Sequence, residues 1–388
     1  MSVTAAKGFR AAGVAAGLKS SGAPDVAVVV NDGPLAEAAA VFTSNRCQAN
    51  PVIWSREAIK HGTAKAVAIN SGGANCYTGA EGFALTHRTA ELVAERLGIS
   101  AIDVQVMSTG LIGLLNDGDD LLGGMGSAID VLSTDGGAAA AAAIMTTDSV
   151  AKEATSQGDG WVVGGMAKGA GMLAPALATM LVTITTDAEI DATLAEAALR
   201  VATAKTFNRL DSDGCQSTND TVLLLVSGAS GVSPDADVFT EALTAVCQDL
   251  ALQLLADAEG ADHEISIEVV NAVTEDEAVE VGRSVARSNL FKAAIFGKDP
   301  NWGRILASVG TTEATFDPAD LDVALNGVWV CRNSGPGESP DAIDLDERQV
   351  TVTIDLKSAP PGSDGATATV WTNDLTHAYV HENSAYST

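Results

Sequence analysis

The chain has 388 residues, more than one small hydrophobic core normally holds, so two domains are expected. It is 46% hydrophobic and 19% charged, which provides for a large core and excludes a disordered chain. A net charge of −28 repels phosphate backbones and anionic membranes, which argues against nucleic-acid binding and membrane association. No apolar run reaches the roughly 20 residues that a membrane helix needs. The five scattered cysteines form no CxxC pair, which favours reduced thiols in a cytoplasmic protein.

Short β-branched runs alternate with amphipathic stretches along the first half, which is typical of an α/β or α+β protein. A glycine should end the helix that finishes at Leu97. The pattern predicts strands at 25–31, 66–70, 103–108 and 161–163, and helices at 83–97 and 136–145.

The second half repeats this alternation. Ser233-Pro234 is expected to open a long helix towards residue 258, with the serine as N-cap and the proline at the first helical position. The segment 333–347 is rich in Pro, Gly and Asp and is expected to be a loop. Strands are predicted at 179–186, 221–226, 265–270, 323–331, 349–356 and 366–372, and further helices at 191–206 and 275–288.

The glycine-rich segment 164–175 cannot be regular structure over its whole length. Within it, residues 169–174 fit the GxGxxA pattern of a dinucleotide-binding loop. Such a loop must open a helix whose N-terminus holds the pyrophosphate, whereas here Pro175 and a β-branched run follow. A nucleotide- or ligand-binding module built on this loop is therefore only a minor alternative.

Metal-binding signatures are also missing. The chain has no HExxH helix and no paired CxxC motifs, so no metal site is expected. Asp211-Ser212-Asp213 resembles the start of a calcium loop, but Gln216 and Val222 stand where that loop needs glycine and glutamate.

Thr179 stands between the glycine-rich loop and a predicted strand. A threonine becomes a good nucleophile when its own α-amine is free, because that amine titrates near neutrality and can accept the hydroxyl proton. Freeing this amine requires cleavage of the Ala178–Thr179 bond, for instance by attack of the Thr179 hydroxyl on the preceding carbonyl. From the residues alone, the commoner interpretation is that Thr179 is an ordinary first residue of a strand.

A set of distinct short sequence blocks is spread along nearly the whole chain. They are VFTSN (41–45), NSGG (70–73), STG (108–110), TTD (146–148), KGAGMLAPALATML (168–181), TND (218–220), FGKDPNWGRI (296–305) and Asn383. With them the chain closely resembles the ornithine acetyltransferase family of arginine biosynthesis, whose members are self-cleaving N-terminal threonine enzymes. It departs from the usual PNMATML form at Ala176 and Leu177, which leaves the threonine untouched.

The resemblance implies a catalytic set. Cleavage would yield an α chain, 1–178, and a β chain, 179–388, with Thr179 as nucleophile and its α-amine as general base. The acetyl group of N-acetylornithine would rest on Thr179, and glutamate would then take it in a ping-pong transfer that needs no metal or bound cofactor. Thr109 and Gly110 match the oxyanion-hole pair, a hydroxyl and a backbone N–H.

The resemblance also implies substrate-binding residues. Lys168 matches a binding lysine and Glu259 a binding acid that could meet the side-chain amine of ornithine. Thr146 matches another binding position, with the adjacent Thr147 as the second choice. Asn383 and Thr388 match the family's C-terminal pair.

The family fold is layered α/β of α-β-β-α type in two domains, with the two chains retained and usually paired as α2β2. Some family members also accept acetyl-CoA as donor, and nothing in the sequence decides this. A self-cleaving aminopeptidase or amidase, which passes the acyl group to water, is the alternative enzyme.

Overall fold

The computed structural model describes residues 2–173 and 180–385, which form two compact units. The first contains the residues up to 208 and residues 216–257, and the second contains residues 209–215 and those from 258 onward.

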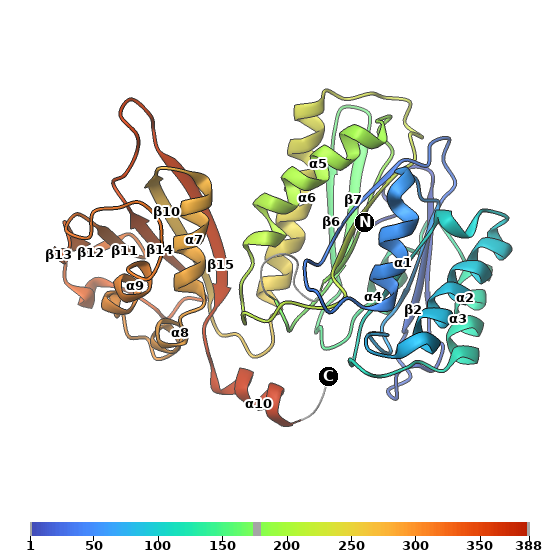
Figure 1. Ribbon diagram of the computed structural model, residues 1–388, viewed down its shortest axis with the longest axis horizontal. Helices are drawn as coiled ribbons and strands as arrows, with labels where there is room; N and C mark the ends of the chain where they lie inside the picture. Colours follow the sequence, from blue (N-terminus) through green and yellow to red (C-terminus); the bar gives the residue numbers. More distant parts are fainter. Residues whose placement is uncertain (1, 174–179, 386–388) are drawn as a thin grey trace. The chain divides into compact units, whose positions relative to one another are not determined.

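Two facing β-sheets form the centre of the first unit (Figure 1). Their shared core includes Phe9, Val29 and Ile69 from one sheet and Met166 and Leu223 from the other, all buried. The four-stranded sheet has the order β1 (Phe9–Val14), β2 (Val26–Asn31), β4 (Ala66–Asn70), β5 (Val104–Ser108). The five-stranded sheet has the order β3 (Ala38–Phe42), β9 (Thr221–Val226), β8 (Leu181–Thr186), β7 (Val162–Lys168), β6 (Lys152–Gln157).

Helices cover the outer faces of both sheets. On the four-stranded sheet, α2 (Gly79–Leu97) and α3 (Gly118–Asp130) pack through buried side chains such as Val93 and Met125. On the five-stranded sheet lie α5 (Ala192–Lys205) and α6 (Ala236–Ala256). The expected α-β-β-α layering is thus confirmed. The remaining elements of the unit are α1 (Asn50–Ala58), α4 (Gly137–Ala143) and short 3-10 helices at Ile59–His61, Ala101–Asp103 and Phe207–Arg209.

Among the described residues, α6 is the one helix that is long and apolar enough to cross a membrane, judged by length and composition alone. Its buried side chains, among them Phe239, Leu243 and Leu250, instead belong to the core against β6 and β7. The predicted start of this helix is wrong. It begins at Ala236, and the carboxylate of Asp235 caps it by accepting the N–H of Asp237 at 2.9 Å.

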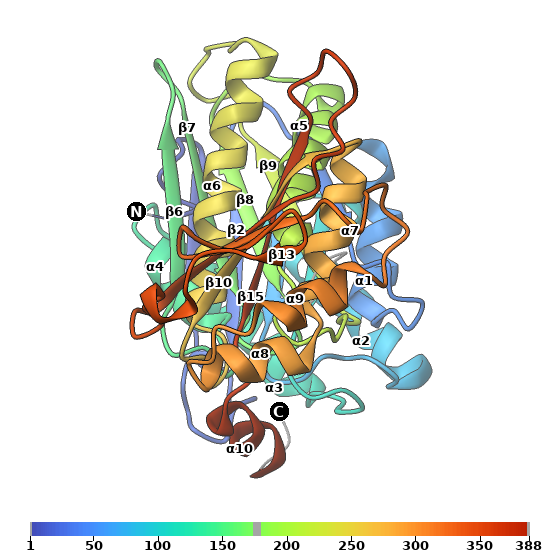
Figure 2. The ribbon, with the colours of Figure 1, turned by 90° about the vertical axis from the view of Figure 1, so that its left-hand side faces the viewer.

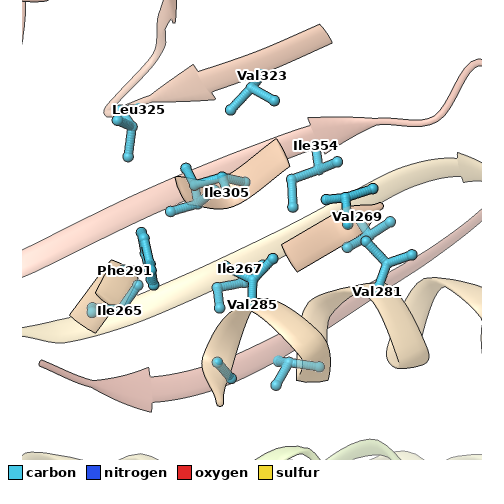
Figure 3. Close-up of a cluster of buried hydrophobic side chains, with 14 of the residues drawn as sticks. Ile265, Ile267, Val269, Val281, Val285, Phe291, Ile305, Val323, Leu325 and Ile354 are labelled. Atoms are coloured by element: carbon cyan, nitrogen blue, oxygen red, sulfur yellow. The ribbon is translucent and has the colours of Figure 1, made fainter. Parts of the chain in front are cut away.

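The second unit is a six-stranded sheet with helices on it (Figure 2). Its core joins Ile267 and Val269 of the sheet to Val281, Val285 and Phe291 of the helices (Figure 3). The strand order is β13 (Gly335–Pro336), β12 (Val328–Arg332), β11 (Asp322–Leu325), β14 (Gln349–Asp355), β10 (Glu264–Ala272), β15 (Ala366–Asn373). The helices are α7 (Glu275–Ala286), α8 (Asn289–Phe296), α9 (Trp302–Val309) and α10 (His377–Ala385), with a 3-10 helix at Pro340–Ala342.

Two sequence predictions need correction. The single strand predicted at 323–331 is the hairpin of β11 and β12, and its turn is Asn326-Gly327, both with positive φ (46° and 82°). The strand predicted at 161–163 continues through two glycines to Lys168 as β7. A Cβ on Gly164 would lie 2.4 Å from the carbonyl oxygen of Ser2, so glycine here permits close packing rather than a loop.

Candidate active site

The parallel strands β4 and β5 end side by side, and the turns that follow them form the first part of the site. The N–H of Thr109 donates to the carbonyl of Asn70 at 2.9 Å. The Asn70 amide donates to the carbonyl of Gly73 at 3.1 Å and accepts the Ser108 hydroxyl at 2.5 Å. The predicted oxyanion residue Thr109, which is buried, is therefore fixed by backbone and side-chain bonds on both strands.

Only glycine fits at position 110. Its φ is +120°, a conformation that L side chains rarely adopt. A Cβ there would lie 2.9 Å from the carbonyl oxygen of Gly72 and 3.0 Å from the Cα of Gly73. The backbone of Gly110 can thus approach both the neighbouring turn and a substrate closely.

Lys168 ends β7 with its side chain directed at Thr109. Its Nζ donates to Thr109 Oγ1 at 3.4 Å and lies 3.8 Å from the carboxylate of Asp148. The lysine is only 2% exposed, so it is not the solvated surface residue that a lysine usually is. Two predicted site residues, at the ends of strands in different sheets, are therefore in contact.

Asp148 organises this corner of the site. One carboxylate oxygen accepts the Gly169 N–H at 2.6 Å, and the other accepts the Thr146 N–H at 2.9 Å. Burial would raise the pKa of this carboxyl, but the ammonium groups of Lys168 and Lys152 hold it well below its usual range. The predicted binding residues Thr146 and Lys168 are thus joined through one charged carboxylate.

A second buried lysine extends the cluster. Lys152 Nζ lies 2.7 Å from Asp148 and 2.5 Å from Asp257, and its side chain is fully buried. The sequence analysis did not identify Asp148 or Lys152 as functional residues. The TTD block contains Asp148, but the partner acid Asp257 lies 105 residues from Lys152, and no local pattern connects them.

The described part of the glycine loop, residues 169–173, lacks the features of a nucleotide site. No helix begins within the described residues 169–173. The Gly169 N–H, which would face a phosphate in such a site, is already bonded to the carboxylate of Asp148. Across residues 2–173 and 180–385 no three His, Cys, Asp or Glu side chains cluster as metal ligands would. None of the five cysteines, all of which lie in the described residues, is in a disulfide.

Glu259 and Asn383, the predicted binding residues of the second unit, are hydrogen-bonded there: Asn383 Nδ2 donates to Glu259 Oε2 at 3.1 Å. Glu259 also lines a cavity of about 400 Å³ together with Asp213, Lys292 and Tyr379. Burial and the negative charges of Asp213 and Glu259 raise the pKa of Tyr379 to about 12. Burial lowers the pKa of Lys292, whose ammonium bonds the Ser212 carbonyl. Thr179, Ala178 and Thr388 lie outside the described residues.

Comparison with known proteins identifies the family of the chain. A profile of the ArgJ family matches residues 10–388. The chain is 60% identical to "Arginine biosynthesis bifunctional protein ArgJ" of Streptomyces coelicolor and 58% identical to the protein of that name in Thermobifida fusca, with 100% of both chains covered in each case. It is also 50% identical to a solved chain of ornithine acetyltransferase complexed with ornithine from Mycobacterium tuberculosis, over 46% of this chain and 96% of that one, with a TM-score of 0.45.

The chain belongs to the ArgJ family. It is accordingly an acetyltransferase of arginine biosynthesis, and the class predicted from the sequence blocks is confirmed. The comparisons do not favour the aminopeptidase or amidase alternative, and they leave the ligand-binding module without support.

Proposed function

We propose that this protein transfers the acetyl group of N2-acetyl-L-ornithine to L-glutamate through an acetyl ester on Thr179. The observation that carries this proposal is the buried contact between Lys168 and Thr109, beside a glycine that admits no side chain. A lysine and a hydroxyl placed in this way suit the negative charge that develops in acyl transfer.

Maturation comes first in the proposal. The Thr179 hydroxyl attacks the carbonyl carbon of Ala178, and the C–N bond breaks as an ester forms and the Thr179 nitrogen gains a proton. Water then hydrolyses the ester, which leaves a carboxylate on Ala178 and a free α-amine on Thr179. The products are the chains 1–178 and 179–388.

Turnover uses the same hydroxyl. The free α-amine accepts the proton of Thr179 Oγ as this oxygen attacks the acetyl carbon of acetylornithine. The amine then protonates the departing ornithine nitrogen. Glutamate attacks the acetyl ester in the second half-reaction and leaves as N-acetylglutamate, which regenerates the threonine. No step requires a metal or bound cofactor.

Thr109 and Gly110 serve as the oxyanion hole. Because the Thr109 oxygen accepts a bond from Lys168, its own proton stays available to the oxyanion. The nearby ammonium charge further stabilises the tetrahedral intermediate. Lys168 thus has a role at the reacting carbonyl besides the substrate binding that the resemblance implies.

Thr146, Glu259, Asn383 and Thr388 are proposed to bind the amino-acid parts of the substrates, with Glu259 meeting the side-chain amine of ornithine. The hydrogen bond between Asn383 and Glu259 supports a joint role for these two. An α2β2 assembly in the cytoplasm, and acetyl-CoA as a second acetyl donor, belong to the same proposal.

The test begins with the intact mass of the denatured protein and the N-terminal sequence of its fragments. Wild type should give two chains, one starting at Thr179, and Thr179→Ala should stay whole. Release of ornithine that depends on glutamate distinguishes the transferase from an amidase, which would consume acetylornithine without it. An active protein that remains one uncut chain would refute the mechanism.

A further inference from the structure

The block Thr218-Asn219-Asp220 lies directly before β9, whose parallel partner β8 follows the proposed nucleophile. Asp220 Oδ1 accepts the N–H of Met180 at 3.1 Å. The N–H of Thr221 donates to the Met180 carbonyl at 3.2 Å. That Met180 N–H belongs to the peptide group joining Thr179 to Met180, so these bonds fix the backbone directly after Thr179.

The neighbouring side chain reaches the other strand end. Asn219 Nδ2 donates to the carbonyl of Ser108 at 2.7 Å and to that of Ala74 at 2.6 Å. Its Oδ1 accepts the Thr218 hydroxyl at 2.6 Å, so the amide orientation is determined on both sides. Since Ser108 precedes Thr109, Asn219 fixes the backbone of the proposed oxyanion hole.

We propose that Asn219 and Asp220 are positioning residues that set the nucleophile against the oxyanion hole, one holding Ser108 and the other Met180. This inference rests on the proposed function, because Thr179 is a nucleophile only there. Because Asn219 and Asp220 are adjacent, their bonds to Ser108 and Met180 directly set the distance between the oxyanion hole and the nucleophile. A misplacement of about 1 Å between reacting groups can cost about 10²-fold in rate.

Asp220 serves here as the hydrogen-bond acceptor for the Met180 N–H. It is completely buried, and its Oδ2 has no hydrogen-bond partner within the described part of the chain. Burial raises the pKa of this carboxyl well above its usual range, against the opposing effects of nearby hydrogen-bond donors and of the Lys168 charge. A neutral carboxyl and a carboxamide have nearly the same shape, and both present a carbonyl oxygen to the Met180 N–H.

The experiment compares Asp220→Ala, Asp220→Asn and Asn219→Ala with wild type. It follows cleavage by intact mass over time, and then kcat and KM for glutamate-dependent transfer by the matured protein. Asp220→Ala and Asn219→Ala should slow cleavage and lower kcat by about 10–10²-fold, with KM changed less than about threefold. Asp220→Asn should restore both rates to within about threefold of wild type, because the acceptor is retained.

Thr183→Val is the matched control, since Thr183 is buried in β8 and its hydroxyl has no partner among the described residues. It should cleave and turn over like wild type. The proposal is overturned if the folded alanine variants match wild type, or if Asp220→Asn is as slow as Asp220→Ala, which would assign Asp220 a charge or proton role. If Asp220→Ala does not fold, Asn219→Ala tests the same positioning role through the bond to Ser108. Turnover by a wild-type protein that remains uncut would instead refute the proposed function.

Discussion

Asp148→Asn should destabilise the first unit strongly. Four buried or nearly buried charges meet there: the carboxylates of Asp148 and Asp257 and the ammonium groups of Lys152 and Lys168, which together are neutral. The asparagine leaves one net positive charge in this cluster. Removing one partner of a buried ion pair typically costs about 3–5 kcal/mol.

In a unit of this size, that loss corresponds to a fall in Tm of about 6–20 °C. Thermal unfolding followed by near-UV circular dichroism measures it. Asp187→Asn is the matched control: Asp187 is equally buried and accepts the N–H groups of Lys7 and Val162, with no ion pair in the described part of the chain. Its loss should be nearer to about 1.5–3 kcal/mol, the scale of one hydrogen bond to a charged group.

The effect should also depend on pH. The Asp148 pKa is lowered on folding, so its contribution to stability is present above the unfolded pKa of about 3.9 and is lost as the pH falls through the folded value. The difference in Tm between wild type and Asp148→Asn should therefore shrink below about pH 4. Equal losses for Asp148→Asn and Asp187→Asn at pH 7 would refute the charge argument.

Three more predictions concern the oxyanion hole and the thiols. Thr109→Val should lower kcat by about 10²–10³-fold with little change in KM, measured in steady state. Gly110→Ala should abolish turnover and cleavage, because its Cβ would meet the Gly72 carbonyl at 2.9 Å, whereas Gly123→Ala in α3, with open space around it, should behave as wild type in the same assays. A thiol reagent should label two cysteines in the folded protein, the exposed Cys47 and Cys215, and all five in guanidinium chloride; fast labelling of a third would contradict the described burial.

Local patterns predicted the strands that are buried on both faces. Residues 66–70 and 221–226 form strands with those limits, because runs of β-branched and aliphatic residues fit little else. The edge strand β6, Lys152–Gln157, was not predicted, because its sequence KEATSQ is mostly polar. The hairpin turn at Asn326-Gly327 did carry a recognisable signal, which the single long strand predicted at 323–331 ignored.

The candidate site divides in the same way. The strand ends that hold Thr109 and Lys168 follow from the alternating pattern and the glycines after it. The links between them do not, since Asn219 reaches Ser108 across 111 residues and Lys168 reaches Thr109 across 59. Such contacts depend on how the sheets pair, and a single sequence does not specify that pairing.

The five-stranded sheet has a consequence for the proposed break before Thr179. Of its strands, β3, β7 and β6 would belong to the first chain, and β8 and β9 to the second. The second chain's pair is then bordered on both sides by the first chain, through the ladders of β9 with β3 and of β8 with β7. Neither polypeptide could leave without unzipping two ladders, a step as slow as global unfolding. The two chains of such a molecule would be held together by backbone hydrogen bonds along both ladders. Exchange of chains between differently labelled preparations should therefore be absent while the fold persists.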